Sequence, residues 1–279
     1  MFLSKIPGCV GGVLTVLFRD FGLLIKGKDR NSDVVLLPKL GWQLLLVLLS
    51  LAAFWLALVL YVDVPITRWT KTLDPELRGL ARQLTDLGKS DLYIAVSAII
   101  IISMIVVRIR SKTADVLRQA RQINAFAAYW LVCIAGSGLL VMVVKQLIGR
   151  ARPKHLEAYG HLFFDPLTFD ASFAGFPSGH ATTSFALVAI VSTLMPRLMP
   201  IAFITGASLA FTRVIVGAHY FSDVVFAGIL ALVFCLFIRR VFAKRGWLFE
   251  PFPDGKFMVK SSFLSALSNL VSRSKTTGQ

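Results

Sequence analysis

Three separated stretches of this 279-residue chain place polar side chains at the ends of long apolar runs. They read KQLIGRARP at residues 145–153, FPSGH at 176–180 and TRVIVGAHYFSD at 212–223. Clustered Lys and Arg side chains repel one another unless an anion lies between them, and the forked donors of Arg fit a phosphate group. We therefore expect the three stretches to meet around a phosphate.

The middle stretch has the features of an anion-binding helix start. Ser178 is placed to cap a helix that begins at Gly179, and the first turn of a helix offers unpaired N–H groups at the positive end of its dipole. Gly179 has no side chain, so a ligand can approach the backbone closely. The residues that follow, ATTS at 181–184, suit close helix contacts, with their hydroxyls bonded back to the helix.

Two histidines and a carboxylate extend this site from binding to reaction. His219 and Asp223 are four residues apart, a spacing that puts them on one face of a helix. A carboxylate that accepts from one ring nitrogen fixes the tautomer and leaves the other nitrogen free to attack phosphorus. His180 is then placed to protonate the leaving oxygen. Because no metal-ligand pattern such as H-E-x-x-H is present, we predict phosphoryl transfer through a phosphohistidine, without metal or other cofactor, with the cations stabilising the transition state.

The elements that must position these residues are long apolar helices. Hydrophobic residues make up 56% of the chain, an excess carried by runs of membrane-spanning length. Six runs can cross a bilayer, although the second and fourth are at or below the usual minimum of about 17 residues. The sequence thus predicts an all-α membrane protein with a bundle of six transmembrane helices, at residues 40–62, 92–107, 125–147, 179–195, 198–216 and 220–238.

The distribution of charge predicts the orientation. The net charge is +15, but no aromatic-basic platform or DNA-reading motif accompanies it, so a nucleic-acid partner is not expected. Lys and Arg gather in segments 1–39, 108–121 and 239–279. Under the positive-inside rule both termini are cytoplasmic, and these charges attract anionic lipid headgroups. The polar residues of the three stretches then lie together at the outer-face ends of the third to sixth helices.

The expected organisation is one membrane domain between two short cytoplasmic segments. Segment 1–39 is cytoplasmic or interfacial, 40–240 holds the six helices, and 241–279 is a cytoplasmic tail. The apolar stretch 10–18 is too short for a convincing signal peptide, and a surface-lying segment near 9–25 fits better. The three cysteines are expected to be buried apolar fillers. Helical spacing of apolar side chains predicts two amphipathic helices in the interface plane, at Leu77, Leu80, Leu84 and Leu87 and at Val259, Phe263, Leu267 and Val271.

The three stretches resemble the motifs of the type 2 phosphatidic acid phosphatase superfamily, which also includes vanadium-dependent haloperoxidases. That family carries Lys, six residues and Arg-Pro, then Pro-Ser-Gly-His, then Ser-Arg, five residues, His, three residues and Asp. The first two motifs match in full, and the third differs only in having Thr212 in place of Ser, which keeps a hydroxyl. The six-helix layout is similar to that of the family's membrane members, so the resemblance covers most of the chain.

The resemblance implies a role for each matching residue. His219 is the nucleophile, Asp223 orients it and His180 is the general acid. The phosphate-binding residues that it implies are Lys145, Arg152, Ser178, Gly179 and Arg213. We accordingly expect an integral membrane lipid phosphatase in a bacterial inner membrane, with its site facing the periplasm, that removes a phosphate monoester or a pyrophosphate from a lipid.

Several alternatives stay open from the sequence alone. Candidate substrates are phosphatidic acid, phosphatidylglycerophosphate, a polyprenyl pyrophosphate and a lipid A phosphate. A phosphotransferase of the same family would pass the phosphate to an acceptor other than water. A transporter, a different class of protein, would place its polar groups near the midplane on broken helices. The oligomeric state is not indicated. A haloperoxidase relative is disfavoured by the membrane spans, and vanadate is expected to inhibit as a phosphate mimic.

Several residues near the motifs have no single predicted role. Arg150 either helps to hold phosphate or faces headgroups, and His155 and His161 are expected to be loop histidines. The aromatic residues of the outer loop either pack over the helix ends or form a wall beside the acyl chains of a lipid: Tyr159, Phe163, Phe164, Phe169 and Phe173.

Overall fold

The computed structural model describes residues 12, 13, 15–17, 19, 29–37, 41–252, 257–266 and 268 of the chain. The chain divides into two compact units, each assembled from segments that are far apart in the sequence. The terminal unit comprises Met1–Leu36, Tyr93–Val132 and Phe237–Gln279, and the central unit comprises Leu37–Leu92 and Cys133–Leu236. All three motifs belong to the central unit.

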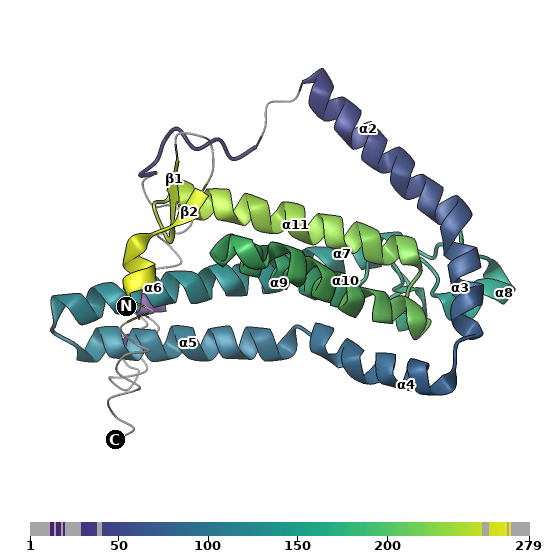
Figure 1. The fold of residues 1–279 in the computed structure, drawn as a ribbon, viewed down its shortest axis with the longest axis horizontal. Coiled ribbons are helices and arrows are strands. Elements are labelled where there is room, and N and C mark those ends of the chain that lie inside the picture. Colours follow the sequence, from purple (N-terminus) through teal and green to yellow (C-terminus); the bar gives the residue numbers. More distant parts are fainter. Residues whose placement is uncertain are drawn as a thin grey trace. The chain divides into compact units, whose positions relative to one another are not determined.

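The central unit is built from helices, two of which are joined by a long loop, residues 149–178, that contains three short helical elements (Figure 1). Its first long helix runs from α2 (Trp42–Ala57) through one π-helical turn, η2 (Leu58–Val62), into α3 (Asp63–Lys71). The other elements are, in chain order, α4 (Pro75–Leu84), η3 (Thr85–Gly88), η4 (Val132–Gly136), α7 (Ser137–Ile148), η5 (Pro153–His155), α8 (Leu156–Tyr159), η6 (Ala171–Phe173), α9 (Gly179–Leu194), η7 (Pro196–Leu198), α10 (Met199–Ile215) and the first part of α11 (Phe221–Lys244).

The core of the central unit lies where α9, α10 and α11 meet. Gly206 of α10 lies so close to α9 that a methyl group in its place would collide with Val188. Small residues let helix backbones approach in a membrane, where packing rather than water exclusion holds helices together. The backbones of α9 and α10 therefore lie close together at this level. The buried cluster that joins these two helices and α11 consists of Ala181, Phe185, Val188, Ala210, Val214, Val224, Ala227 and Ala231.

The terminal unit contains most of α5 (Asp91–Arg110), α6 (Ala114–Leu131), the last part of α11 and a two-stranded antiparallel sheet. In the sheet, β1 (Phe249–Pro251) pairs with β2 (Phe257–Val259). The ring of Phe249 packs edge-on against Tyr129 of α6. The prediction of an all-α chain is therefore wrong for this hairpin, because strands of three residues are too short to leave an alternating pattern in the sequence.

Other predictions for the two terminal segments lie only partly within the described residues. In the tail, Val259 belongs to β2, so the predicted amphipathic helix does not begin there, and Phe263 is buried in a helical stretch at 261–266. Leu267 and Val271 lie outside the described residues, as does Cys9; Cys133 and Cys235 are buried. Of the predicted surface-lying segment 9–25, residues 12, 13, 15–17 and 19 are described and are helical, and some of them pack against α5 and α6.

The other predicted amphipathic helix is present as α4 as far as Leu84, whereas Leu87 lies in the turn η3. It begins after Asp74, whose side chain accepts a hydrogen bond from the backbone N–H of Glu76 at 2.7 Å, and a proline occupies its first turn. Leu77, Leu80 and Leu84 are 45%, 51% and 40% exposed. Exposed leucines on one short helix suit an element that lies along a lipid interface.

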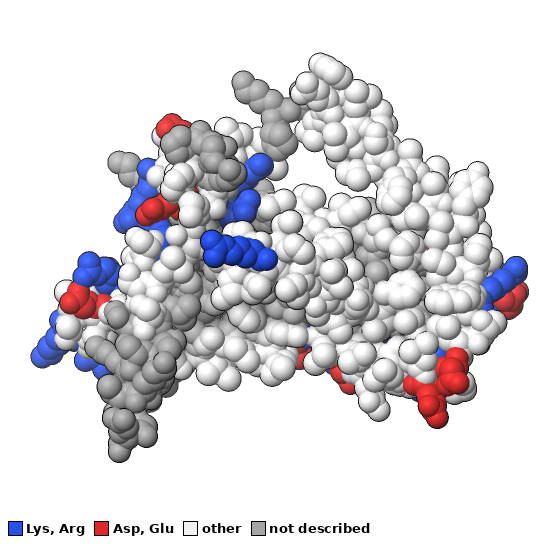
Figure 2. All heavy atoms as spheres, in the orientation of Figure 1, with Lys and Arg blue, Asp and Glu red and all other residues white. Residues whose placement is uncertain are grey.

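Five helices within the described ranges are long and apolar enough to cross a membrane: Trp42–Lys71, Pro75–Arg110, Ala114–Ile148, Pro196–Ile215 and Phe221–Lys244. They coincide with five of the six predicted spans. The remaining one, α9, has only 16 residues, so a sixth crossing stays a prediction. Figure 2 shows the surface of α2 without charged atoms, and shows charged atoms at the end of the central unit that carries α4 and α8. This pattern is typical of helices surrounded by lipid.

Candidate active site

The central unit brings the motifs together at the ends of four helices. Lys145 lies in the last turn of α7 and Arg213 in the last turn of α10, while His180 lies in the first turn of α9. His219 precedes α11, and Asp223 lies in the first turn of that helix. The backbone N–H of Ser178, at the start of α9, donates to the carbonyl oxygen of Asp223 at 3.3 Å and so joins the second motif to the third.

His219 is held by a backbone carbonyl rather than by the expected carboxylate. It is 2% exposed, and its Nδ1 atom lies 2.6 Å from the carbonyl oxygen of Gly175. Nδ1 is 3.9 Å from Oδ2 of Asp223, beyond hydrogen-bond range, and His219 lies in the turn before α11 rather than on the same helical face as Asp223. Because a carbonyl oxygen only accepts, Nδ1 carries the proton and the lone pair of Nε2 is available.

Burial and charge keep the ring of His219 neutral. Burial lowers its pKa well below the usual value, and the cations Lys145, Arg213 and Arg152 lower it further. A neutral imidazole with an available Nε2 is the form that can attack phosphorus. All three cations act on the ring of His219. We call them the phosphate cluster, because the sequence predicts that they bind phosphate.

The two arginines of the phosphate cluster have donors without partners. The Nε atoms of Arg152 and Arg213 are buried and make no hydrogen bond to any described residue. Arg213 Nη1 donates to the hydroxyl of Thr85 at 3.1 Å, which holds the guanidinium against η3. Burial lowers the pKa of Arg152 from its usual value. Because buried donors are costly to leave unpaired, these two side chains are suited to an anionic ligand.

The N-terminus of α9 has the predicted cap. Ser178 is fully buried, and its hydroxyl accepts from the backbone N–H of Ala181 at 3.4 Å. The space beside Gly179 is open, since a methyl group there would meet no atom within 4 Å. The side chains that follow donate to carbonyl oxygens one turn earlier, as expected; they are Thr182, Thr183 and Ser184. The first-turn N–H groups that helix geometry leaves unpaired thus adjoin open space.

Arg150 uses all of its N–H groups in contacts with the protein. Nη1 donates to Oδ1 of Asp223 at 2.5 Å and to Oγ of Ser222 at 2.8 Å. Nη2 donates to Oδ2 of Asp63 at 2.8 Å, and Nε and Nη2 donate to the carbonyl oxygen of His161 at 3.2 and 3.1 Å. A guanidinium has five N–H donors, so none is left for phosphate or a headgroup. Neither of the two roles left open by the sequence therefore fits Arg150.

The surroundings of Arg150 stabilise its charge. Arg150 is 1% exposed, and Asp63, Ser222 and Asp223 are fully buried. Burial alone lowers the pKa of Arg150, but the carboxylates of Asp223 and Asp63 more than offset it, and the pKa is raised. We call Asp63, Arg150, Ser222 and Asp223 the Asp63 network. It ties the first motif to the third through charges that water does not reach.

Two parts of the site were not identified from the sequence. Asp63 ends the first apolar run, but a single carboxylate at the end of a span has no motif around it. The turn η3 lies against two residues of the site. The hydroxyl of Thr85 accepts from Nη1 of Arg213, and a methyl group at Gly88 would come within 3.2 Å of Cβ of His180. A Thr and a Gly in an outer turn are a weak signal, so η3 is recognised only from the structure.

Aromatic rings pack against one another in the predicted outer loop, residues 153–176. The ring of His155 stacks on Phe173 at 5.1 Å between centroids, and Tyr159 stacks on Phe163 at 4.7 Å. These rings thus pack against one another within the loop, and their packing over the helix ends stays a prediction. Phe164 and Phe169 are instead 43% and 74% exposed, so their contact with acyl chains stays a prediction. His161 enters the site only through its carbonyl oxygen, which accepts from Arg150.

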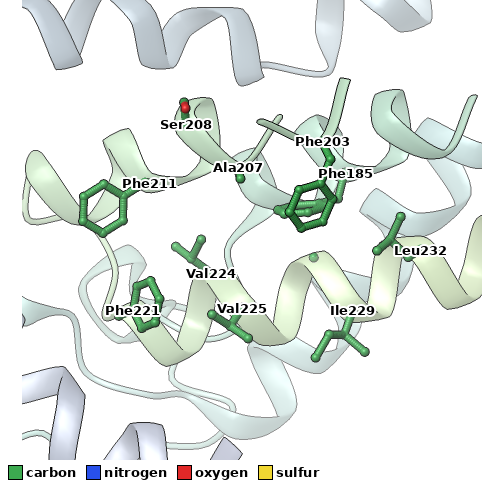
Figure 3. Close-up of a pocket in the computed structure, with 11 residues that line it drawn as sticks. Phe185, Phe203, Ala207, Ser208, Phe211, Phe221, Val224, Val225, Ile229 and Leu232 are labelled. Carbon is green, nitrogen blue, oxygen red and sulfur yellow. The ribbon is translucent and has the colours of Figure 1, made fainter. Parts of the chain in front are cut away.

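An apolar groove of about 500 Å³ runs along α9, α10 and α11 (Figure 3). Its wall on α11 is formed by Val224, Val225, Ile229 and Leu232, and Phe185 and Phe203 lie at one end. At the other end, Phe211 and Phe221 are two residues from Arg213 and Asp223 in the sequence. The groove therefore begins at the same level of these helices as the motif residues.

The helices and the site define a class of protein: a helical membrane protein that gathers three partly buried cations beside a neutral histidine. The model of the PAP2 superfamily matches residues 126–247, which contain all three motifs. A lipid A 1-phosphatase of Rhizobium johnstonii is 38% identical over 249 residues, which cover 89% of this chain and 100% of that protein. A lipid A 1-phosphatase of Rhizobium etli is 36% identical over 228 residues, or 81% of this chain and 96% of that protein.

The chain belongs to the PAP2 superfamily. It is a multi-pass membrane enzyme that hydrolyses a phosphomonoester of a lipid. Two solved structures are also similar. A PAP2-type phosphatidylglycerolphosphate phosphatase of Bacillus subtilis has 25% identity and a TM-score of 0.45 over 68% of this chain and 93% of that chain. LpxE of Aquifex aeolicus has 16% identity and a TM-score of 0.43 over 63% of this chain and 94% of that chain.

Proposed function

We propose that this enzyme removes the 1-phosphate of lipid A through a phosphohistidine on His219. The observation that carries the choice of substrate is the similarity to two lipid A 1-phosphatases over nearly their whole lengths. Among the substrates left open by the sequence, this similarity favours a lipid A phosphate over phosphatidic acid, phosphatidylglycerophosphate and a polyprenyl pyrophosphate.

The first half of the reaction transfers the phosphoryl group to the enzyme. The phosphate binds between the phosphate cluster and the start of α9, where Ser178 and Gly179 lie. Nε2 of His219 attacks phosphorus, and the bond from phosphorus to the lipid oxygen breaks. His180 donates a proton to that oxygen as it leaves. The unpaired donors of Arg152 and Arg213 stabilise the charge that builds on the phosphoryl oxygens.

The second half of the reaction returns the enzyme to its starting state. A water molecule attacks the phosphorus of phosphohistidine while His180, now neutral, takes a proton from the water. The bond between phosphorus and Nε2 breaks, inorganic phosphate leaves, and His219 regains its lone pair. Asp223, with Oδ2 at 3.9 Å from Nδ1, stabilises the positive charge that the ring carries while it bears the phosphoryl group.

The proposed orientation places this reaction at the periplasmic face of a bacterial inner membrane. Lys and Arg concentrate in the two terminal segments and in 108–121, which the positive-inside rule assigns to the cytoplasm. The motifs lie at the opposite ends of the helices. This arrangement requires α9 to act as a sixth crossing, and its 16 residues fit where the bilayer thins or the flanking residues contribute.

Phosphate release from defined lipids by the purified enzyme in detergent and EDTA tests the proposal. We expect release from lipid A that carries a 1-phosphate and none from lipid A that carries only its other phosphate. His219→Ala should lose the activity, and His155→Ala, a loop histidine, should keep it. Equal turnover of phosphatidic acid or a polyprenyl pyrophosphate would refute the substrate assignment, and loss of activity in EDTA would refute metal independence. With ¹⁸O-labelled water, label in the released phosphate distinguishes hydrolysis from transfer to another acceptor.

A further inference from the structure

Asp63 anchors the first turn of α11, although it comes from a helix 159 positions earlier in the chain. Its Oδ1 atom accepts from the backbone N–H of Ser222 at 2.8 Å, and its Oδ2 atom accepts from the Ser222 hydroxyl at 2.6 Å. A carboxylate that accepts from a first-turn N–H group acts as a helix cap and fixes where the helix begins. Asp63 thus sets the position of the turn that carries His219.

Asp63 also holds Arg150, which reaches the surroundings of His219 by two routes. Through its side chain, Arg150 binds Oδ1 of Asp223 at 2.5 Å, and the ring of Tyr220 lies 4.4 Å from its guanidinium carbon. Through its backbone, its carbonyl oxygen accepts from the N–H of Gly175 at 2.9 Å. Both acceptors near Nδ1 of His219, the Gly175 carbonyl and the Asp223 carboxylate, are therefore tied to one arginine.

Close contacts restrict movement of both the backbone route and the side-chain route. A side chain at Gly175 would come within 2.7 Å of the carbonyl oxygen of Arg150, so the two backbone segments are in direct contact. Oδ2 of Asp223 accepts from the backbone N–H of Tyr220 at 2.8 Å, which fixes the residue next to His219.

We propose that Asp63 is a positioning residue for the reaction: it fixes Arg150 and the start of α11, and through them the two acceptors that surround Nδ1 of His219. This inference rests on the proposed role of His219 as nucleophile. Asp63 touches neither substrate nor the phosphate cluster. Its loss should therefore slow the chemical step without weakening substrate binding.

Asp63→Asn tests this inference, because it keeps the size of the side chain and removes its charge. We expect kcat for lipid A 1-phosphate to fall by about 10- to 100-fold, the size of effect that a small misplacement of a reacting group produces, with KM changed by less than about twofold. The matched control is Asp74→Asn, which alters an exposed carboxylate that caps α4 in the same unit, and should leave kcat unchanged. An unchanged kcat in Asp63→Asn, or a rise in KM alone, would overturn the proposal.

A double-variant comparison separates positioning from a general loss of stability. If Asp63 acts through Asp223, then Asp63→Asn combined with Asp223→Asn should be no slower than Asp223→Asn alone. A multiplied loss would show that Asp63 does not act through Asp223, and would overturn the part of the proposal that runs through this carboxylate. Full activity of His219→Ala would instead refute the proposed mechanism itself, so the two failures are distinguishable.

A milder variant keeps the test decisive if Asp63→Asn does not fold. Ser222→Ala retains both carboxylates and Arg150, and removes one hydroxyl that bonds to Asp63 and Arg150. We expect kcat to fall by about 3- to 10-fold, the effect of one hydrogen bond, with an unchanged melting temperature in detergent. Wild-type kcat in this variant would contradict the proposal.

Discussion

Arg150 and Arg152 are two residues apart in the first motif, yet they have opposite surroundings. Arg150 belongs to the Asp63 network, where its N–H groups all have partners and two buried carboxylates balance its charge. Arg152 belongs to the phosphate cluster, where its Nε atom has no partner among the described residues and burial lowers its pKa. The difference indicates that the first arginine stabilises the fold, while the second has a donor suited to an anionic ligand.

The contrast extends to the two regions as wholes. The Asp63 network is satisfied without a ligand, because each cation and carboxylate in it has hydrogen-bond partners. The phosphate cluster gathers three positive charges around a neutral histidine and is not balanced in the same way. A region that is complete in the free protein contributes to folding and geometry, whereas a region that is incomplete contributes to binding and catalysis.

The largest effect is expected on stability, when the Asp63 network loses its cation. Arg150→Met leaves two carboxylates buried without a counter-charge, which costs about 3–5 kcal/mol of the free energy of unfolding. Thermal melting in detergent and the yield of monodisperse protein measure this loss. Arg118→Met, which removes an exposed arginine paired with Asp115, serves as the control and should melt like wild type. An Arg150→Met protein that melts like wild type would contradict the contrast between the two regions.

The next effect is expected on activity, when the phosphate cluster loses a cation. Arg213→Met should lower kcat/KM by about 10²- to 10³-fold, since one donor to the transition-state charge is removed. Its melting temperature should fall only slightly, because the Nε atom that disappears has no partner among the described residues and the hydrogen bond that is lost is the one from Nη1 to the Thr85 hydroxyl. Initial rates and melting curves on the same preparation measure both quantities. Activity within threefold of wild type would remove Arg213 from the phosphate-binding set.

A smaller effect is expected on the pH dependence of stability. The pKa of His219 is lowered in the folded protein, so the unfolded chain binds this proton more readily below its ordinary value of about 6.5. The contribution of His219 to stability is therefore present above about pH 6.5 and is lost as the pH falls, by at most about 1.4 kcal/mol per pH unit. Melting temperatures of wild type and His219→Asn between pH 5 and 8 measure it. The wild-type curve should fall more steeply below pH 6.5, and parallel curves would argue against a neutral, buried His219.

The smallest effect is expected at η3. Thr85→Val removes the hydroxyl that accepts from Arg213 and should lower kcat/KM by about 3- to 10-fold, as for the loss of one hydrogen bond. The matched control is Thr72→Val, which removes an exposed hydroxyl that bonds to a carbonyl of its own helix. If both variants retain wild-type kcat/KM, η3 does not position Arg213.

The sequence predicted the parts of the protein that depend on local pattern. Apolar runs indicated the long helices, and Ser178 before Gly179 indicated the start of α9. The bounds of α9, Gly179–Leu194, agree with the predicted run at 179–195 to within one residue. The hairpin of β1 and β2 was less accessible, because strands of three residues are too short for an alternating pattern to show.

The sequence did not predict contacts made by backbone atoms or by isolated side chains. The Gly175 carbonyl is the acceptor for His219, and a carbonyl oxygen is present at every position of the chain, so no residue type marks it. Asp63 pairs with Arg150 across 87 positions, without a spacing that a helix or turn would impose. For the same reason the sequence left the role of Arg150 open while assigning Arg152 to phosphate, and only the fold shows how the two differ.

Trapping of a phosphoryl enzyme is the most direct test of the central claim that His219 takes the phosphoryl group. The enzyme is mixed with lipid A labelled with ³²P in its 1-phosphate, denatured within milliseconds and analysed by peptide mapping at neutral to alkaline pH. The account predicts label on His219 in wild type and in His155→Ala, and none in His219→Ala. Label on any other residue, or label that persists in His219→Ala, would contradict the account.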